Sequence, residues 1–161
     1  MEDVTDTSAT AERAVANDTG ASQTLRLDDA GTADDGLITV DDGGTGAFTG
    51  LTLASPTDAL TLRAGDAGDT VEIAGTGASS TAAIAVAGGA GDDTLAGPDT
   101  DSSWRITGDD AGTLNDVAFS GIEDLQGAAD NEDEFVINAD GALSGTLAGG
   151  DAGFDTLVLD G

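Results

Sequence analysis

Short clusters of aliphatic and β-branched residues recur along this chain at nearly even spacing, and this spacing restricts the fold more than any other feature. One series comprises Leu37–Val40, Leu60–Leu62, Ala83–Val86, Trp104–Ile106, Ile122–Leu125 and Gly145–Leu147. A second, interleaved series comprises Phe48–Leu53, Val71–Ile73, Asp93–Leu95, Val117–Phe119, Phe135–Ile137 and Leu157–Leu159. Within each series the clusters lie about 22 residues apart, which indicates an internal repeat.

The clusters have the length and pattern of short β-strands. Most alternate apolar and polar residues, as in Leu60-Thr61-Leu62 and Val71-Glu72-Ile73, and this alternation predicts one buried face. Gly, Asp, Ala, Ser and Thr fill the gaps, as turns require. Two short strands in about 22 residues match one coil of a parallel β-solenoid. We therefore expect an all-β parallel solenoid; the alternative is an antiparallel β-sandwich of short strands.

The first part of the chain differs from the rest. Residues 1–24 contain few large apolar residues and no alternation, which predicts a disordered leader or linker. Residues 25–161 would then form the solenoid domain. At 161 residues the chain is one domain or a piece of something longer.

The charge of the chain excludes several classes of partner. It has 32 acidic residues against 4 arginines, with no lysine or histidine, and a net charge of −28. Such a surface cannot neutralise phosphates, so we expect neither nucleic-acid binding nor contact with an anionic membrane. No apolar run is long enough to span a bilayer, so no membrane insertion is expected. Cations or a high-salt environment would relieve the self-repulsion.

The apolar content is low for a folded domain. Val, Ile, Leu and Phe together number 32 of 161 residues. With this net charge, that composition is close to the border of intrinsic disorder. Either the apolar residues are placed economically, or the chain needs ions to fold.

The turns before the strands of the second series are acidic. Each carries at least two carboxylates and a glycine; they span residues 41–44, 65–69, 88–93, 109–112, 127–133 and 149–155. In a solenoid they would form one column at the strand spacing of ~4.8 Å, where carboxylates repel unless a cation intervenes. Calcium accepts such carboxylates together with backbone carbonyls, whereas zinc and iron would need His or Cys.

We therefore expect calcium as the bound ion. The expected ligating residues are Asp66, Asp69, Gly88, Gly89, Gly91, Asp92, Asp93, Asp130, Asp133, Asp151 and Asp155. The alternative is a general adaptation to high salt, in which the carboxylates hold water and bind no specific ion.

One segment resembles a known family. Gly88, Gly89, Gly91, Asp93 and Leu95 follow the pattern of the haemolysin-type (RTX) calcium-binding repeat of large secreted bacterial proteins and adhesins. Residues 149–157 resemble it with one inserted residue, and residues 104–125 look like the spacers between such repeats. The resemblance implies calcium binding and a secreted or cell-surface location. The copies lie apart here, whereas the family runs them in tandem.

Enzymatic activity is not expected. The chain has no His, Cys, Lys or Tyr, so the usual bases and nucleophiles are missing. Glycoside hydrolases use pairs of carboxylates as catalytic groups, and Asp92-Asp93 and Asp109-Asp110 are such pairs. However, few aromatic residues are present to hold a sugar.

We expect a structural role instead: a calcium-binding repeat segment that serves as a stiff acidic stalk or spacer and whose folding Ca2+ assists. Its partners would be calcium, neighbouring repeats of a longer chain, or a second copy end to end. The alternative is a salt-adapted acidic solenoid of a surface layer or extracellular matrix that has no specific ion sites, or that assembles through open ends.

Overall fold

A computed structural model describes residues 4–6, 8, 10–17, 19–30, 35–46, 50–76 and 82–161 of the chain. These residues form sixteen strands in two sheets of eight and no helix, which confirms the all-β class. Within these ranges no helix is long and apolar enough to cross a membrane. Phe48, expected at the start of a strand, lies outside the described residues.

The first sheet, sheet A, has the order β1-β5-β4-β3-β7-β9-β13-β15. Its strands are β1 (Val4–Asp6), β3 (Thr24–Asp29), β4 (Leu37–Asp41), β5 (Leu51–Ala54), β7 (Thr70–Ile73), β9 (Thr94–Ala96), β13 (Asp124–Gln126) and β15 (Leu147–Ala148). Sheet B has the order β16-β14-β10-β11-β12-β8-β6-β2. Its strands are β2 (Glu12–Ala16), β6 (Ala59–Gly65), β8 (Ala83–Gly89), β10 (Ser103–Gly108), β11 (Ala111–Leu114), β12 (Val117–Ser120), β14 (Glu134–Asn138) and β16 (Thr156–Asp160).

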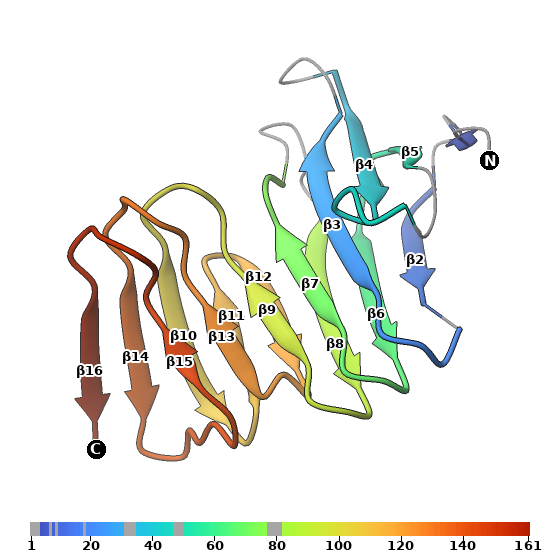
Figure 1. The fold of residues 1–161 in the computed structure, drawn as a ribbon. Coiled ribbons are helices and arrows are strands. Elements are labelled where there is room, and N and C mark those ends of the chain that lie inside the picture. Colours follow the sequence, from blue (N-terminus) through green and yellow to red (C-terminus); the bar gives the residue numbers. More distant parts are fainter. Residues whose placement is uncertain are drawn as a thin grey trace.

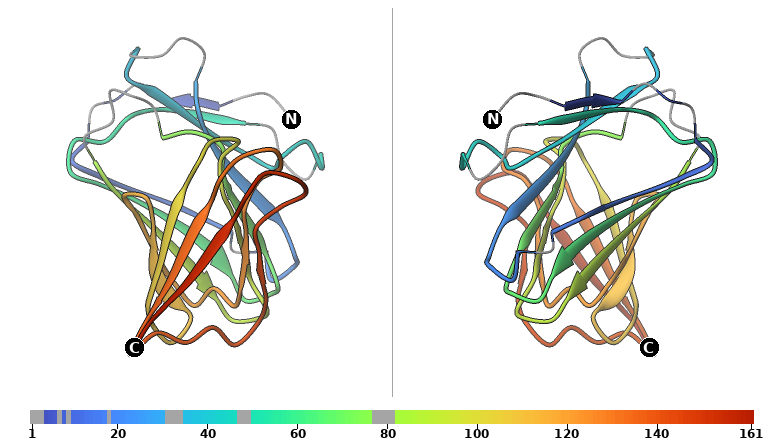
Figure 2. Two further views of the ribbon diagram at one scale, coloured as in Figure 1. Left: turned by 90° about the vertical axis from the view of Figure 1, so that its left-hand side faces the viewer. Right: turned by 90° about the vertical axis from the view of Figure 1, so that its right-hand side faces the viewer.

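The chain crosses repeatedly between the two sheets, and most strands pair in parallel (Figure 1). Ten of the fourteen described strand pairings are parallel. Between β6 and β8, Leu60 pairs with Ile84 and Leu62 with Val86, so inward residues stack on inward residues. The two layers enclose the core, as the views along the stack show (Figure 2).

Two antiparallel meanders interrupt the parallel pairing. β3-β4-β5 lies within sheet A, and β10-β11-β12 lies within sheet B. Both sheets are therefore mixed, and a parallel solenoid with uniform coils is not confirmed. The expected repeat persists between the meanders and after them, where Thr70 pairs with Thr94 and Glu134 with Thr156. The alternative of an antiparallel sandwich does not describe the sheets either, because parallel pairs outnumber antiparallel ones.

β11 is an element within the expected solenoid domain that the sequence does not predict. Residues 109–112 were expected to form a turn, but only Asp109 and Asp110 do so, and Ala111 and Gly112 already belong to the strand. A side chain at Gly112 would collide with the carbonyl of Arg105 and the ring of Phe119. The position therefore needs glycine for close strand packing, and this glycine reads as a turn in the sequence.

This additional strand changes which sheet each series occupies. In the second series the clusters at β5, β7 and β9 lie in sheet A, but those at β12, β14 and β16 lie in sheet B. The expectation that all the acidic turns form a single column is therefore wrong.

The segment expected to be a leader contributes strands. β1 pairs with β5, and β2 pairs with β6 along all five of its residues. Arg13 stands in register with the core residue Leu60, and its guanidinium lies 2.8 Å from the carboxylate of Asp6. This ion pair explains how a polar segment, poor in large apolar residues, covers one end of the core.

The core is narrow but continuous. In sheet A, Val71, Leu95 and Leu125 lie in one inward column and are each at most 1% exposed. In sheet B the ring of Trp104 stacks on Phe135 with their centroids 5.4 Å apart. Because no strand supplies more than three buried residues, and β2, β15 and β16 supply none, the small number of large apolar residues suffices.

Candidate functional site

The expected ligands lie along two edges of the molecule. Residues 65–69 and 88–93 connect sheet B to sheet A and lie along the lower edge in Figure 1. Residues 127–133 and 149–155 connect sheet A to sheet B and lie along the upper edge. The acidic pairs 41–42 and 109–110 belong instead to the meanders within a single sheet.

Three acidic residues at the lower edge form a hydrogen-bonded chain, called here the lower column: Asp69, Asp93 and Glu123. Asp93 Oδ1 accepts the backbone N–H of Asp69 at 2.7 Å. Glu123 Oε2 accepts the N–H of Asp93 at 2.8 Å. Asp69 Oδ1 in turn accepts the N–H of Gln23 at 2.6 Å. Each carboxylate thus binds the backbone of the neighbouring turn.

Asp133 and Asp155 form the corresponding upper column. Asp133 Oδ1 accepts the N–H of Ser102 at 2.8 Å. Asp155 Oδ1 accepts the N–H of Asp133 at 3.0 Å. The same arrangement of carboxylate and backbone N–H therefore occurs on both edges of the molecule.

The strand pairing explains why a carboxylate is needed at these positions. Thr94 N–H donates to the carbonyl of Asp69 at 2.8 Å, so the regular parallel pattern would direct the N–H of Asp69 to the carbonyl of Asp92. The chain at Asp92 has already left the sheet. The side chain of Asp93 takes the place of that carbonyl and adds one more hydrogen bond to the ladder, so the buried N–H is satisfied.

Two of these carboxylates are buried and only half satisfied. Asp93 is 0% exposed and Asp133 is 2% exposed. The Oδ2 atom of each has no hydrogen-bond donor among the described residues. Burial of a charged oxygen without a partner is unfavourable.

The pKa values of both groups reflect this environment. Burial raises the pKa of Asp93, and the charge of Glu123 acts in the same direction. Burial likewise raises the pKa of Asp133, and the charge of Asp155 adds to the effect. Hydrogen bonds from the backbone N–H groups of Asp69 and Ser102 oppose the two shifts.

The glycines of the motif make room for these carboxylates. A side chain at Gly88 would meet Asp93 Oδ2 and the carbonyl of Gly121, and one at Gly127 would meet Asp133 Oδ2. Gly89 and Gly91 instead have φ values of +114° and +123°, which favour glycine. The three glycines around residue 90 thus serve the packing of adjacent turns, independently of any bound ion.

The remaining expected ligands lie at the tips of the turns. Asp66, Asp92, Asp130 and Asp151 are exposed, whereas Asp69, Asp93 and Asp133 are buried and Asp155 is half-buried. Within the described ranges, no group of three or more acidic side chains is arranged to hold a metal ion.

As they lie, the described residues therefore do not bring together the carboxylates that a calcium ion needs, and calcium binding stays a prediction. The donor chemistry is suitable, since carboxylate and carbonyl oxygens are abundant. However, one oxygen each of Asp93 and Asp133 already accepts a backbone N–H, and the other oxygen is enclosed against Gly88 or Gly127.

Sequence reasoning missed part of the columns. Glu123 belongs to the lower column, and Gln23 and Ser102 supply N–H groups, yet none of the three was expected to belong to the site. The signal shared by the residues of both columns, and by Gln23 and Ser102, is their position directly before a strand. Exposed and buried aspartates, such as Asp92 and Asp93, differ only in that position.

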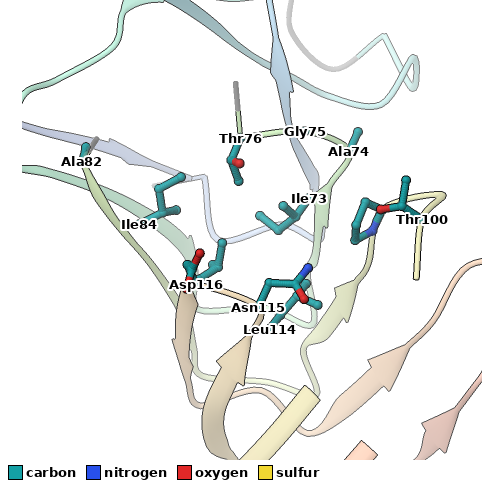
Figure 3. A pocket seen from close by; sticks show the side chains of 12 residues that line it. Ile73, Ala74, Gly75, Thr76, Ala82, Ile84, Thr100, Leu114, Asn115 and Asp116 are labelled. Carbon is teal, nitrogen blue, oxygen red and sulfur yellow. The ribbon is translucent and has the colours of Figure 1, made fainter. Parts of the chain in front are cut away.

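A separate hollow of about 300 Å³ lies between the sheets (Figure 3). Ile73, Ile84 and Leu114 line it together with Asn115 and Asp116. Asp116 is the one carboxylate of its described lining. Glycoside hydrolysis uses a pair of carboxylates as acid and base, and these lining residues supply only one.

Comparison of the chain with family models, with curated proteins and with solved structures finds no match. The resemblance of Gly88–Ala96 to RTX repeats stays a prediction from the sequence.

Removing one carboxylate of the lower column should destabilise the fold. Asp93→Ala leaves the buried N–H of Asp69 without an acceptor, and we expect a loss of about 1–3 kcal/mol in the free energy of unfolding. The matched control Asp92→Ala removes an exposed neighbouring charge and should change it by less than about 0.5 kcal/mol. Urea unfolding monitored by the fluorescence of Trp104, the only tryptophan, measures both.

Asp93→Asn separates the hydrogen bond from the charge. The amide oxygen still accepts the N–H of Asp69, while the buried negative charge is removed. We expect this variant to be at least as stable as the wild type at pH 7. Equal losses in Asp93→Ala and Asp92→Ala would contradict the role assigned to the column.

Stability should rise as the pH falls from 7 to about 5. The raised pKa values of Asp93 and Asp133 mean that the folded state binds more protons than the unfolded state above the ordinary aspartate pKa of about 3.9. Their stabilising contribution is therefore complete below that value and is lost as the pH rises through the folded pKa.

Melting temperatures across this range measure the effect. Relief of the overall negative charge also contributes, so the control is the double variant Asp93→Asn with Asp133→Asn. It should show a smaller rise than the wild type. An identical rise in both proteins would exclude the two buried carboxylates as the source.

Proposed function

We propose that this chain is a structural segment of a secreted or cell-surface protein and acts as a stiff acidic spacer. In this proposal it is a β-solenoid with two inserted meanders, and the carboxylate columns join its successive coils. The supporting observation is the repeated hydrogen bond from a turn N–H to the carboxylate of the next turn, which occurs five times in the two columns.

The pairing of the strands supports the solenoid. β6, β8 and β12 follow one another in parallel within sheet B, and β7, β9 and β13 do so within sheet A. The carboxylate hydrogen bonds at the lower edge continue the ladder of β7, β9 and β13 beyond the ends of these strands. A stack held by both backbone and side-chain bonds resists bending and shear, as a spacer requires.

The surface supports operation in salt. The net charge of −28 opposes compaction in water, and salt screens that repulsion. Asp66, Asp92, Asp130 and Asp151 project at the turn tips, where they hold water and cations without entering the core. The resemblance to RTX repeats supports a secreted or cell-surface location in a large bacterial protein such as an adhesin.

Calcium is the second candidate for the role of these turns. The observation in its favour is the pair of buried oxygens without donors, Asp93 Oδ2 and Asp133 Oδ2. Binding there would require the turns to open, because the ion would have to displace the contacts with Gly88 and Gly127. Ions that bind only a folded state stabilise it by mass action.

An ion titration distinguishes the two candidates. The protein is treated with chelator and unfolded by heat in sodium chloride, magnesium chloride and calcium chloride at equal ionic strength. The acidic spacer without specific sites predicts equal melting temperatures in all three salts. Specific calcium sites predict a higher melting temperature with calcium at millimolar levels or below, and loss of that increase in the double variant Asp93→Asn with Asp133→Asn.

A separate measurement can contradict the proposal of a spacer without ion sites. If the chelated protein shows no strand signal in far-UV circular dichroism even in high salt without calcium, the carboxylate columns do not hold the fold alone. The proposal of a spacer without ion sites would then be wrong.

A further inference from the structure

The hollow between the sheets has a structural cause in the meander β10-β11-β12. In sheet A, β7 and β9 are direct neighbours, whereas in sheet B the strands that follow them in the chain, β8 and β10, are separated by β12 and β11. The connection from β7 to β8 and the connection from β9 to β10 therefore start side by side and end apart. The hollow is lined by residues of both connections and by the β11-β12 hairpin. It is thus a consequence of the inserted strands in the middle of the stack.

The walls of the hollow are core residues. Ile73, Ile84, Leu114 and Val117 line it, and each is at most 6% exposed. In Figure 3 the first three of these side chains surround the hollow from β7, β8 and β11. Its volume of about 300 Å³ equals that of about ten water molecules in the liquid. Walls of this kind favour an apolar group of similar size over water.

The β11-β12 hairpin places two polar residues, Asn115 and Asp116, at the exposed rim of the hollow. Asn115 N–H donates to the carbonyl of Ser103 at 2.7 Å, and Asn115 Oδ1 accepts the N–H of Ser103 at 2.9 Å. These two bonds fix the tip of the hairpin to the start of β10. The carboxylate of Asp116 has no hydrogen bond or ion pair within the described ranges, so it is available to a ligand.

The charge at this rim determines the kind of ligand. Asp116 is the one carboxylate of the described lining, so the hollow does not offer the six to eight oxygens that calcium takes. The net charge of −28 attracts cations to the molecule and repels anions. A ligand that fits both the walls and the rim therefore combines one positive charge with an apolar body.

We propose that the hollow binds a small organic ammonium ion. Its positive charge lies at Asp116, and its apolar part lies between Ile73, Ile84 and Leu114. A body of about ten non-hydrogen atoms fills the volume, by comparison with the same number of water molecules. The site contains no residue of the lower or the upper column, so it does not depend on the calcium alternative or on the spacer function.

Three compounds of similar shape test the proposal: 2-phenylethylamine, 2-phenylethanol and phenylacetate. At pH 7 they are positive, neutral and negative. NMR spectra of the full chain are recorded with chelator at about 0.1 M sodium chloride, where the surface charge is only partly screened. We expect the amine to cause saturable shifts at the methyl groups of Ile73, Ile84 and Leu114. The alcohol should cause the same shifts with about three- to fivefold weaker affinity, as for the loss of an exposed ion pair, and phenylacetate should cause none.

A pair of variants tests the role of the rim. Asp116→Asn should weaken binding of the amine about three- to fivefold and leave binding of the alcohol unchanged. The matched control Asp92→Asn removes an exposed carboxylate that does not line the hollow, and it should leave both affinities unchanged. In 1 M sodium chloride the amine should lose its advantage over the alcohol, because salt screens an exposed pair.

Three results would overturn the proposal. The first is the absence of saturable shifts at the three wall residues, which would show that the hollow takes no such ligand. The second is equal affinity for the amine and phenylacetate, which would exclude selection by charge. The third is an equal loss in Asp116→Asn and Asp92→Asn, which would trace the preference to the overall charge and not to the rim. Each of these results leaves the spacer proposal and the calcium alternative unaffected.

Discussion

The structure depends on one hydrogen bond, repeated from turn to turn: a backbone N–H just before a strand donates to the carboxylate of the next turn. It extends five of the ten parallel ladders by one bond beyond the strand, where the chain has already left the sheet. A charged acceptor makes this bond stronger than a neutral one. It thereby aligns turns that carry few apolar residues and could otherwise slip relative to one another.

This hydrogen bond also accounts for the glycine pattern and for the unfavourable burial of carboxylate oxygens that have no donor. The carboxylate of Asp93 reaches the backbone only because Gly88 has no side chain, and Asp133 depends on Gly127 in the same way. The second oxygen of each aspartate is then buried without a donor. The columns therefore combine a favourable tie with an unfavourable buried charge, and protonation or an amide substitution retains the first while relieving the second.

Much of the secondary structure was accessible from the sequence, because strand residues alternate and turns carry Gly and Asp. Val71–Ile73 and Phe135–Ile137 lie in strands as expected. β11 was missed because Gly112 resembles a turn residue, and only the tertiary contact with Arg105 and Phe119 makes it a strand residue. That one strand changed the sheet assignment of every later cluster.

The site was predictable in composition but not in detail. Acidic glycine turns were recognised, yet both Asp92 and Asp93 were expected to bind the ion, and only the structure shows that Asp93 is buried and Asp92 exposed. Glu123 takes the place of an aspartate in the lower column, where its carboxylate accepts the N–H of Asp93. The choice between a cation and a backbone N–H as the partner of these carboxylates depends on distances between neighbouring turns, which no single repeat encodes.

Amide hydrogen exchange measured by NMR tests the central claim most directly. The N–H groups of Asp69, Asp93 and Asp133 lie outside the strands, so without the columns they should exchange as fast as the exposed turn amide of Asp92. If the carboxylate bonds hold the stack together, these three amides exchange as slowly as the strand interior, represented by Leu95 and Val136. Fast exchange at all three, with slow exchange confined to the strands, would contradict the account.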